Sequence, residues 1–517
     1  GGNIQINGYW GNDKITGTAG NDVIIGGGDN DALNGGNGSD DYLYFGFFDE
    51  TWETFEGFDT IADKGTSGTD RILALSPGNV DIGMAKFSGS GVEVIDGTGA
   101  GGMVTLLGDW NANILDFSKT TFIGGNIQIN GYWGNDKITG TTGNDVIIGG
   151  GDDDILNGGN GSDDYLVRGY FSDDWGTFEH YDTYADTGTS GTDCILAIAS
   201  GNVDIGLKTF GPTSGIDVID GTGAGGTVTL LGDWESNVLN FSTTTFVGSN
   251  IRINGYWGND TITGTTGNDV ILGGGDDDTL NGGNGSDDYW VQGYVSGEWG
   301  IFEGYDTYSD TGTSGTDRIL AIGSGNVDIG LLSFGPGSGI EIIDSTGAAG
   351  TVTLLGHWDA NVLDFSATQL IGANLRIDGD WGNDTIIGSV GNDVIIGGGG
   401  DDILTGGLGS DILTGGECCD RFVFNSSAEI GKGANRDRIL DFETDWDLID
   451  LAGIDANTLL AGNQAFTFIG ASTFSNQAGQ LRFAGGLLSG DTNGDGINDF
   501  ELAVSGVSSL QSNHFTL

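Results

Sequence analysis

The sequence contains few basic residues, histidines, cysteines and prolines. Sixteen lysines and arginines stand against 74 acidic residues, so the net charge is −58. Nucleic acids and anionic membrane surfaces repel such a chain, so we expect no nucleic acid as a partner and expect cations instead. Three cysteines, two of them adjacent, give no disulfide framework. No apolar run approaches the ~20 residues of a membrane span, and no N-terminal signal peptide is evident.

The sequence also lacks the motifs of common hydrolytic sites. None of its three histidines has a partner at helical spacing, and neither H-E-x-x-H nor G-x-S-x-G occurs. Cys194 takes the position that Arg71 and Arg318 hold in sister repeats, which favours an incidental cysteine. Carboxylates are abundant but lie in repeated phrases, whereas a glycosidase or lyase site is a single irregular constellation. We therefore expect a protein that is not an enzyme.

The 102 glycines belong to a sequence that repeats with a long period. NIQINGYWGND at residue 3 returns at 126, as NIRINGYWGND at 250 and as NLRIDGDWGND at 374. This period divides the chain into repeat unit 1 (1–125), repeat unit 2 (126–249), repeat unit 3 (250–373), a partial fourth unit (374–423) and a C-terminal segment (424–517).

Within each unit a shorter repeat of nine residues appears. Nonapeptides follow one another without a gap at 8–43, 131–166, 255–290 and 379–423, where the last block has five copies, and single copies begin at 65, 188 and 312. Each has a half rich in small residues, an aspartate at its sixth position and an apolar residue at its eighth. The glycines allow a tight turn, and the apolar triplet forms a very short strand with one inward side chain. One such strand cannot bury a core, so we predict stacked parallel coils.

The stretches between these blocks are less regular. Residues 92–125 keep short β-branched runs at roughly ten-residue intervals, which indicates further coils with longer corners. Residues 44–64, 167–187 and 291–311 are aromatic and acidic. We predict that each of these three forms a protruding loop or hairpin.

Stacked coils would place the sixth-position aspartates in a column with ~5 Å between backbone levels. Like charges at this distance repel by about 3 kcal/mol at an effective dielectric of 20. Divalent cations between the levels would turn this repulsion into cross-linking. Carboxylates and glycine carbonyls are hard oxygen donors, which suit Ca²⁺ better than Mg²⁺, and zinc is poorly served by so few histidines and cysteines.

The tandem pattern GG-x-G-x-D-x-apolar-x resembles the RTX (hemolysin-type) calcium-binding repeat. The resemblance implies a parallel β-roll with two nonapeptides per turn and calcium held by glycine turns and aspartates. We therefore predict an all-β fold, an elongated right-handed parallel β-roll or β-helix solenoid of nonapeptide coils with a C-terminal β-rich cap. The implied calcium ligands are Asp13, Asp22, Asp31, Asp40, Asp70, Asp136, Asp145, Asp154, Asp163, Asp193, Asp260, Asp269, Asp278, Asp287, Asp317, Asp384, Asp393, Asp402, Asp411 and Asp420.

Some copies depart from this pattern. Tyr9 and Asp380 replace the second glycine in the first copy of their blocks, and Cys418 replaces the fourth-position glycine of GGECCDRFV. The outermost sites of each block lack one neighbour. These are the positions at which the resemblance predicts calcium binding least strongly.

The segment from residue 420 resembles the C-terminal cap and secretion region of serralysin-type proteins. The resemblance implies type I export, without a cleaved N-terminal signal. Within it, DTNGDGIND is a partial EF-hand-like loop with Leu502 at the expected acidic twelfth position. The sequence of this loop is compatible both with calcium binding and with a plain Asx-rich hairpin turn. The candidate ligands are Asp491, Asn493, Asp495 and Asp499.

Tryptophans recur at fixed places in each unit. Our interpretation is that the corner residues at 10, 133, 257 and 381 and at 110, 234 and 358 cover the ends of the small core. Trp52, Trp175 and Trp299 lie in the aromatic segments, where an interface is favoured.

The sequence as a whole predicts an extracellular, calcium-binding structural protein of the cell surface. Folding on calcium binding and self-association into a surface layer, sheath or filament are expected. The alternatives are a secreted adhesin or glycan-binding module, with cell-surface glycans as partners, and the noncatalytic tail of a larger hydrolase or epimerase.

Overall fold

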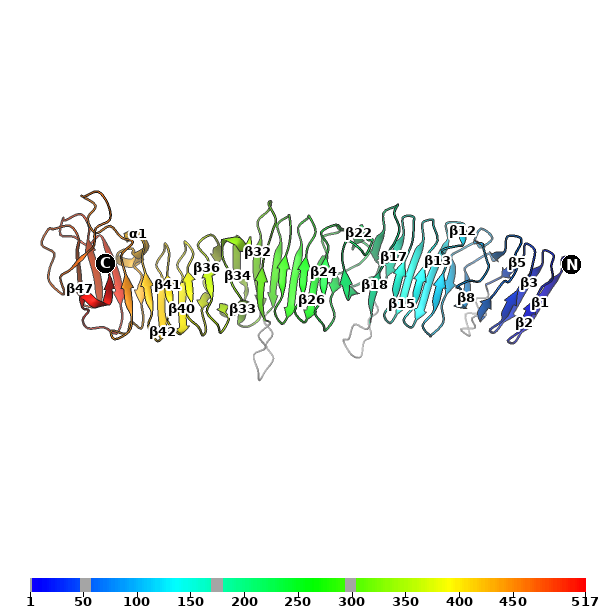
Figure 1. The fold of residues 1–517 in the computed structure, drawn as a ribbon, viewed down its shortest axis with the longest axis horizontal. Coiled ribbons are helices and arrows are strands. Elements are labelled where there is room, and N and C mark those ends of the chain that lie inside the picture. Colours follow the sequence, from blue (N-terminus) through cyan, green and yellow to red (C-terminus); the bar gives the residue numbers. More distant parts are fainter. Residues whose placement is uncertain (1, 47–56, 169–179, 293–303) are drawn as a thin grey trace. The chain divides into compact units, whose positions relative to one another are not determined.

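The computed structural model describes residues 2–46, 57–168, 180–292 and 304–517. The chain forms two compact units, Gly1–Asp233 with Asn237–Asn254 and Trp234–Ser236 with Gly255–Leu517. Each unit consists of stacked parallel coils (Figure 1). The boundary between the two compact units falls near the start of the third repeat unit. The division into five domains that the sequence predicts stays a prediction.

A coil is built from two nonapeptides, each of which supplies one short strand. In β2 (Lys14–Thr16) only Ile15 points into the core, and in β4 (Ala32–Asn34) only Leu33 does. The two strands are parallel, with Ile15 opposite Leu33, so one turn of the coil takes two nonapeptides. The eighth-position residues therefore stack into one continuous core, as the sequence predicts.

The parallel strands of the first unit lie in several sheets. One has the order β1 (Gln5–Trp10), β3 (Val23–Gly28), β5 (Asp41–Tyr44), β7 (Arg71–Ala74), β9 (Val94–Asp96) and β12 (Thr121–Ile123). A second has the order β2, β4, β6 (Phe58–Ile61), β8 (Val80–Lys86), β10 (Val104–Leu107), β13 (Ile127–Trp133), β15 (Val146–Gly151), β17 (Asp164–Val167), β19 (Cys194–Ala197), β22 (Val218–Asp220) and β25 (Thr245–Val247). Further strands are β11 (Ile114–Asp116), β14 (Lys137–Thr139), β16 (Ile155–Asn157), β18 (Tyr181–Tyr184), β20 (Val203–Leu207), β23 (Val228–Leu231) and β26 (Ile251–Trp257), and β21 (Thr209–Phe210) pairs with β24 (Val238–Asn240).

The second unit continues the same pattern. One series is β28 (Val270–Gly275), β30 (Asp288–Gln292), β32 (Arg318–Gly323), β34 (Ile342–Ala348) and β37 (Gln369–Ile371). A second is β27 (Thr261–Thr263), β29 (Thr279–Asn281), β31 (Tyr305–Tyr308), β33 (Val327–Leu331), β35 (Val352–Gly356), β38 (Leu375–Asp378), β40 (Val394–Gly399), β42 (Ile412–Glu417) and β44 (Arg438–Ile439). A third is β36 (Val362–Asp364), β39 (Thr385–Ile387), β41 (Ile403–Thr405), β43 (Arg421–Val423), β45 (Leu448–Asp450) and β50 (Phe515–Thr516).

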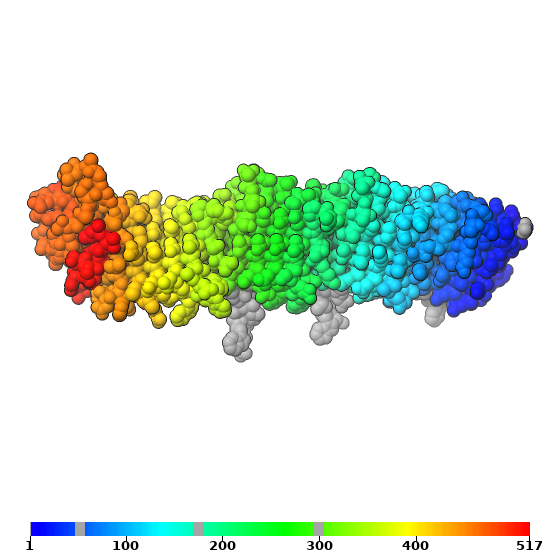
Figure 2. All heavy atoms as spheres, viewed as in Figure 1, coloured from blue at the N-terminus to red at the C-terminus, as the bar shows by residue number. Residues whose placement is uncertain are grey.

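The C-terminal segment ends the coils of the second unit with antiparallel strands. β47 (Gln480–Ala484) pairs with β48 (Leu487–Asp491), which pairs with β49 (Phe500–Val504), and β46 (Thr467–Phe468) lies beside β47. Its orange and red atoms cover that end of the unit in Figure 2. Within the described residues, helix is confined to α1 (Ser427–Ile430) and the 3₁₀ turns η1 (Pro336–Ser338), η2 (Gly433–Asn435) and η3 (Ser512–His514). Across the described ranges no helix is long and apolar enough to cross a membrane. The predicted all-β parallel β-roll is confirmed.

Two expectations need correction. The aromatic stretch 44–64 is not a loop throughout, because β6 (Phe58–Ile61) is a strand of the second sheet. The strands β18 and β31 correspond to β6 in repeat units 2 and 3. Trp52, Trp175 and Trp299 lie outside the described residues.

The corner tryptophans do not cover the core. Trp10 is 82% exposed and Trp110 is 65% exposed, and the others are exposed by a third or more. Trp133 lies over Gly151 of the next coil, where a Cβ would sit 2.6 Å from the indole. Ile15 and its equivalents already fill the core, so the indoles remain on the surface.

Candidate metal centre

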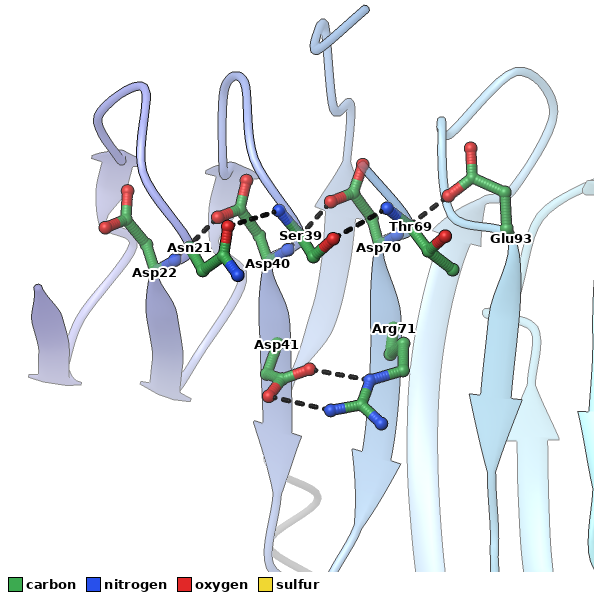
Figure 3. A network of polar contacts seen from close by, with 9 residues as sticks. All are labelled: Asn21, Asp22, Ser39, Asp40, Asp41, Thr69, Asp70, Arg71 and Glu93. Atoms are coloured by element: carbon green, nitrogen blue, oxygen red, sulfur yellow. Dashed lines mark hydrogen bonds and ion pairs between the residues drawn. The ribbon is translucent and has the colours of Figure 1, made fainter. Parts of the chain in front are cut away.

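The sixth-position aspartates lie one above another and are tied by their own backbones. The N–H of Asp22 donates to Oδ1 of Asp40 at 2.7 Å, and the N–H of Asp40 donates to Oδ1 of Asp70 at 2.8 Å (Figure 3). Beside them the N–H of Ser39 donates to the side-chain oxygen of Asn21. Each coil thereby fixes one oxygen of the carboxylate in the next coil.

The same bond repeats in both units, and we call each series a carboxylate column. The columns of the first unit are Asp13, Asp31 and Asp59; Asp22, Asp40 and Asp70; Asp136, Asp154 and Asp182; and Asp145, Asp163 and Asp193. Those of the second unit are Asp260, Asp278 and Asp306; Asp269, Asp287 and Asp317; Asp384, Asp402, Asp420 and Asp447; and Asp393, Asp411 and Asp437. Every predicted nonapeptide aspartate lies in a column, and all of them except Asp13 are buried.

Many of these carboxylates have a second oxygen that is buried and lacks a hydrogen-bond partner in the part of the chain that the structure describes. Asp154 accepts the N–H of Asp136 at 2.7 Å through Oδ1 but has no such partner on Oδ2. A buried polar atom left unpaired costs about 1–3 kcal/mol, and more when it is charged, so these oxygens call for a cation or a proton. They are Oδ2 of Asp13, Asp31, Asp40, Asp136, Asp154, Asp163, Asp278, Asp287, Asp384, Asp402, Asp411, Asp420 and Asp437.

The first glycine of the nonapeptide leaves space in front of these oxygens. A Cβ on Gly131 would lie 2.2 Å from Oδ2 of Asp136 and 2.4 Å from the carbonyl oxygen of Gly149 in the next coil. Gly379 stands in the same relation to Asp384, with 2.4 Å to its Oδ2. A carboxylate and a backbone carbonyl thus share one space that only glycine keeps open. This set of hard oxygen donors fits Ca²⁺.

Without a cation, protons take the place of the metal in these columns. Burial, together with the nearby carboxylate of Asp182, raises the pKa of Asp154 to about 9. Burial and Asp306 do the same for Asp278, whose pKa is also raised to about 9. Burial raises the pKa of Asp163 to about 7. The metal-free columns are therefore partly protonated at neutral pH, and calcium must displace these protons.

The second nonapeptide of each block differs from its neighbours. In GTTGND the N–H of Thr141 donates to Oδ2 of Asp145 at 2.6 Å, and the Thr141 hydroxyl lies 3.1 Å from Oδ1. Thr18, Thr265 and Ser389 bond Asp22, Asp269 and Asp393 in the same way. The residue in place of the second glycine donates hydrogen bonds to the carboxylate oxygens, where a cation would otherwise bind. The sequence treats these four aspartates like the others, and the structure distinguishes them.

Sequence reasoning missed several members of the columns. Asp59 lies beneath Asp31, whose N–H donates to it at 2.9 Å, and Asp182 and Asp306 take equivalent places. A signal was present, because Gly57, Asp59 and Ile61 keep the fourth, sixth and eighth positions of a nonapeptide. Asp437 and Asp447, in the C-terminal segment, were also missed.

Three clusters bring a third carboxylate to a column. Asp63 joins Asp40 and Asp70, and one oxygen from each lies within 4.8 Å of the others. The other two clusters are Asp163, Asp186 and Asp193, and Asp287, Asp310 and Asp317. Their middle members come from outside the nonapeptide positions.

The loop of the C-terminal segment uses its side chains to close a turn between β48 and β49. Asp491 is fully buried and accepts the N–H groups of Gly494 and Gly496, at 2.6 and 2.9 Å. Asp499 accepts from Thr492, and the side chains of Asn493 and Asp495 each accept a backbone N–H two residues ahead. These contacts are those of an Asx-rich turn, and calcium binding in this loop stays a prediction.

Coils whose turns carry buried, unpaired carboxylates define a cation-binding parallel β-roll. The family model of the RTX calcium-binding nonapeptide repeat matches the chain in four copies, at residues 7–42, 130–165, 254–289 and 378–413. The chain therefore carries RTX calcium-binding repeats, and calcium ions are its ligands. Proteins with these repeats are typically secreted. A comparison with curated proteins gave no match.

Proposed function

We propose that this protein is a noncatalytic, calcium-dependent structural protein of the cell surface, a subunit of a surface layer, sheath or filament. The observation that carries the proposal is the series of carboxylate columns, in which buried oxygens such as Oδ2 of Asp154 lack a partner among the described residues. With a net charge of −58, repulsion between acidic groups opposes folding of the chain until cations bind.

Export would bring the chain to a place where calcium is plentiful enough to fold it. Extracellular calcium modules typically work at about 10⁻⁴ to 10⁻³ M, a level that the cytosol does not reach. Binding is then coupled to folding outside the cell. The segment from residue 420, which resembles the serralysin-type secretion region, is the proposed export signal.

Sedimentation and circular dichroism across a calcium titration test the proposal. We expect cooperative β-formation between chelator and millimolar calcium, followed by large ordered species. A β-roll that forms on calcium addition but sediments as a monomer at all concentrations would contradict assembly. A chain that is fully folded in chelator would contradict calcium-dependent folding.

A second candidate, a glycan-binding role, is favoured by the exposed tryptophans. Trp110 stacks against Trp133 with ring centroids 6.4 Å apart and planes within 9°, and Tyr132 meets Trp110 edge-on at 4.8 Å. Trp234 and Trp257 repeat the pair at 6.4 Å and 7°. Flat, solvent-facing indoles offer stacking surfaces for sugar rings. The negative charge favours neutral over acidic glycans.

Binding to neutral polysaccharides, followed by tryptophan fluorescence, separates the two candidates. The adhesin role predicts that a Trp110→Ala and Trp234→Ala variant loses binding, while Trp446→Ala, which removes another indole exposed by 61%, retains it. Equal behaviour of both variants would leave only the structural role.

A further inference from the structure

The three clusters share one arrangement that the nonapeptide pattern does not contain. Asp63 lies in the turn between β6 and β7, outside the sixth-position series, and Tyr42 donates its hydroxyl to Oδ2 of Asp63 at 2.6 Å. The N–H of Gly35 reaches the same oxygen at 3.0 Å, and the N–H of Gly65 donates to Oδ1 at 2.7 Å. The carboxylate of Asp63 is thereby fixed in position beside Asp40 and Asp70.

The same construction occurs again in each following repeat unit. Tyr165 donates to Asp186, and Tyr289 donates to Asp310 at 2.7 Å. Each tyrosine occupies the inward eighth position of the fourth nonapeptide, and each is at most 1% exposed. A buried tyrosine hydroxyl requires a partner, and in all three units that partner is the third carboxylate.

An unpaired oxygen lies in each cluster. Asp40, Asp163 and Asp287 are fully buried, and their Oδ2 atoms have no hydrogen-bond partner among the described residues. Their Oδ1 atoms already accept a backbone N–H, at 2.7 to 2.8 Å. The cluster therefore combines a fixed extra carboxylate with a buried oxygen that only a cation or a proton satisfies.

We propose that each cluster is a three-carboxylate calcium site, the tightest class of site in the protein, with Asp63, Asp186 and Asp310 as ligands and Tyr42, Tyr165 and Tyr289 as positioning residues. Calcium affinity rises with the number of charged ligands and with the rigidity of the site. The three clusters fill before the remaining positions of the columns. The site therefore joins Asp63, Asp186 or Asp310, at the described C-terminal end of each aromatic segment, to the adjacent nonapeptide block.

The fourth block provides an internal contrast. Leu413 takes the place of the tyrosine, and the N–H of Asp411 donates to Oδ1 of Asp437 at 2.7 Å. The described residues of this block form no three-carboxylate cluster. Asp411 is nevertheless buried with an unpaired Oδ2. This block is a two-carboxylate site, which we expect to fill later than the clusters.

Calcium titration calorimetry of the full chain tests the proposal. The wild type should show a tight class of three ions, which falls in affinity by about tenfold or more in Asp63→Asn, Asp186→Asn and Asp310→Asn combined. The matched control, Asp31→Asn, Asp154→Asn and Asp278→Asn, removes three buried column carboxylates outside the clusters and should keep the tight class. A single class of sites in the wild type, or equal loss in the control, would overturn the proposal.

A second variant covers the case in which the triple aspartate variant does not fold. Tyr42→Phe, Tyr165→Phe and Tyr289→Phe retain every carboxylate, so the tight class should keep its three ions but bind them several-fold more weakly. In the wild type, the tyrosine near-UV absorbance should change until three ions are bound and then stop changing. An affinity unaltered by the three phenylalanines would overturn the positioning role. These outcomes do not depend on whether the protein assembles at a surface.

Discussion

Asn113 donates a hydrogen bond from its side-chain amide to Oδ1 of Asp109 at 2.8 Å and accepts the N–H of Asp109 at the same distance. It occupies a position equivalent to the sixth aspartate, because its own N–H donates to Oδ1 of Asp136 at the top of a carboxylate column. A second amide hydrogen points to the carbonyl of Ala85 at 3.4 Å. The Asn113 amide donates hydrogen bonds to oxygens that would otherwise be available to a cation. Asn237 and Asp233 repeat this pair of hydrogen bonds at 2.8 Å, so repeat units 1 and 2 each contain a coil whose sixth-position residue is a neutral, hydrogen-bonded amide.

Asn113→Asp should convert such a coil to calcium dependence. The new carboxylate would face Asp109 and Asp136 and lose the amide donors, at a cost of about 1–3 kcal/mol for the unpaired buried group. Hydrogen exchange of β10 and β11 should therefore speed up at a calcium concentration just sufficient for folding, and excess calcium should restore part of the protection. Asn111→Asp, which adds the same charge at an exposed position, is the control and should change little.

Thr141→Gly restores the double glycine of the repeat and removes the hydroxyl from Asp145. The N–H of Asp145 still donates to Oδ1 of Asp163, but the carboxylate of Asp145 loses the threonine hydroxyl, and the space in front of it opens for an ion. We expect lower stability at a calcium concentration just sufficient for folding, by about 1 kcal/mol for the lost hydrogen bond, and a gain of calcium binding. Urea unfolding of the full chain, at that calcium concentration and at saturation, measures both. Thr142→Gly, at an exposed neighbour, should show neither effect, and an unchanged calcium stoichiometry would mean that the hydroxyl does not exclude the ion.

The period of the sequence predicted the coils because an eighth-position residue such as Ile15 has only one way to be buried in a triplet strand. It also predicted that sixth-position aspartates stack in a column, whereas the structure shows which of them share one. It could not show that Asp63 meets Asp40 and Asp70, because that contact depends on how the coil returns after the aromatic segment. Nor could it show that the corner indoles stay outside, since a repeated tryptophan fits a core and a surface pattern equally well.

The difference between Thr141 and its glycine equivalents is visible in the sequence, but its meaning is not. Only the structure shows that the N–H and hydroxyl of Thr141 both reach the carboxylate four residues ahead. The amide of Asn113 is a similar case, because GDWNANILD keeps the nine-residue phase with asparagine at the sixth position. In both, a small change of side chain exchanges a metal contact for a hydrogen bond.

Cys194→Arg should add an ion pair that the second repeat unit lacks. Arg71 holds Asp41 through two bonds at 2.9 and 3.1 Å, and Cys194 lies opposite Asp164 in the same register. We expect a gain of about 0.2–1 kcal/mol, because exposed ion pairs contribute little, and the gain should shrink in high salt. Thermal unfolding in excess calcium at two salt concentrations measures it. Burial raises the pKa of the Cys194 thiol to about 12, so the wild-type residue should also react slowly with thiol reagents. A gain independent of salt would point to packing instead of charge.

Acid should stabilise the calcium-free fold. Burial, with Asp182 or Asp306 nearby, raises the pKa of Asp154 and of Asp278 to about 9, against an ordinary value of 3.8. A carboxyl whose folded pKa is raised contributes stability that is complete below its unfolded pKa and is lost as pH rises through its folded pKa. Metal-free protein should therefore lose β-structure between about pH 4 and 9, as followed by circular dichroism after calcium is removed on a chelating resin.

With calcium the direction reverses, because the ion and the proton compete for the same oxygens. Apparent calcium affinity should rise with pH over that range, and calorimetry in buffers of different ionisation enthalpy should detect protons released on binding. Asp154→Asn and Asp278→Asn remove two of the most strongly shifted groups, so this double variant should release fewer protons and show a shallower pH dependence. Proton release equal to that of the wild type would mean that other carboxylates carry the protons in the metal-free fold.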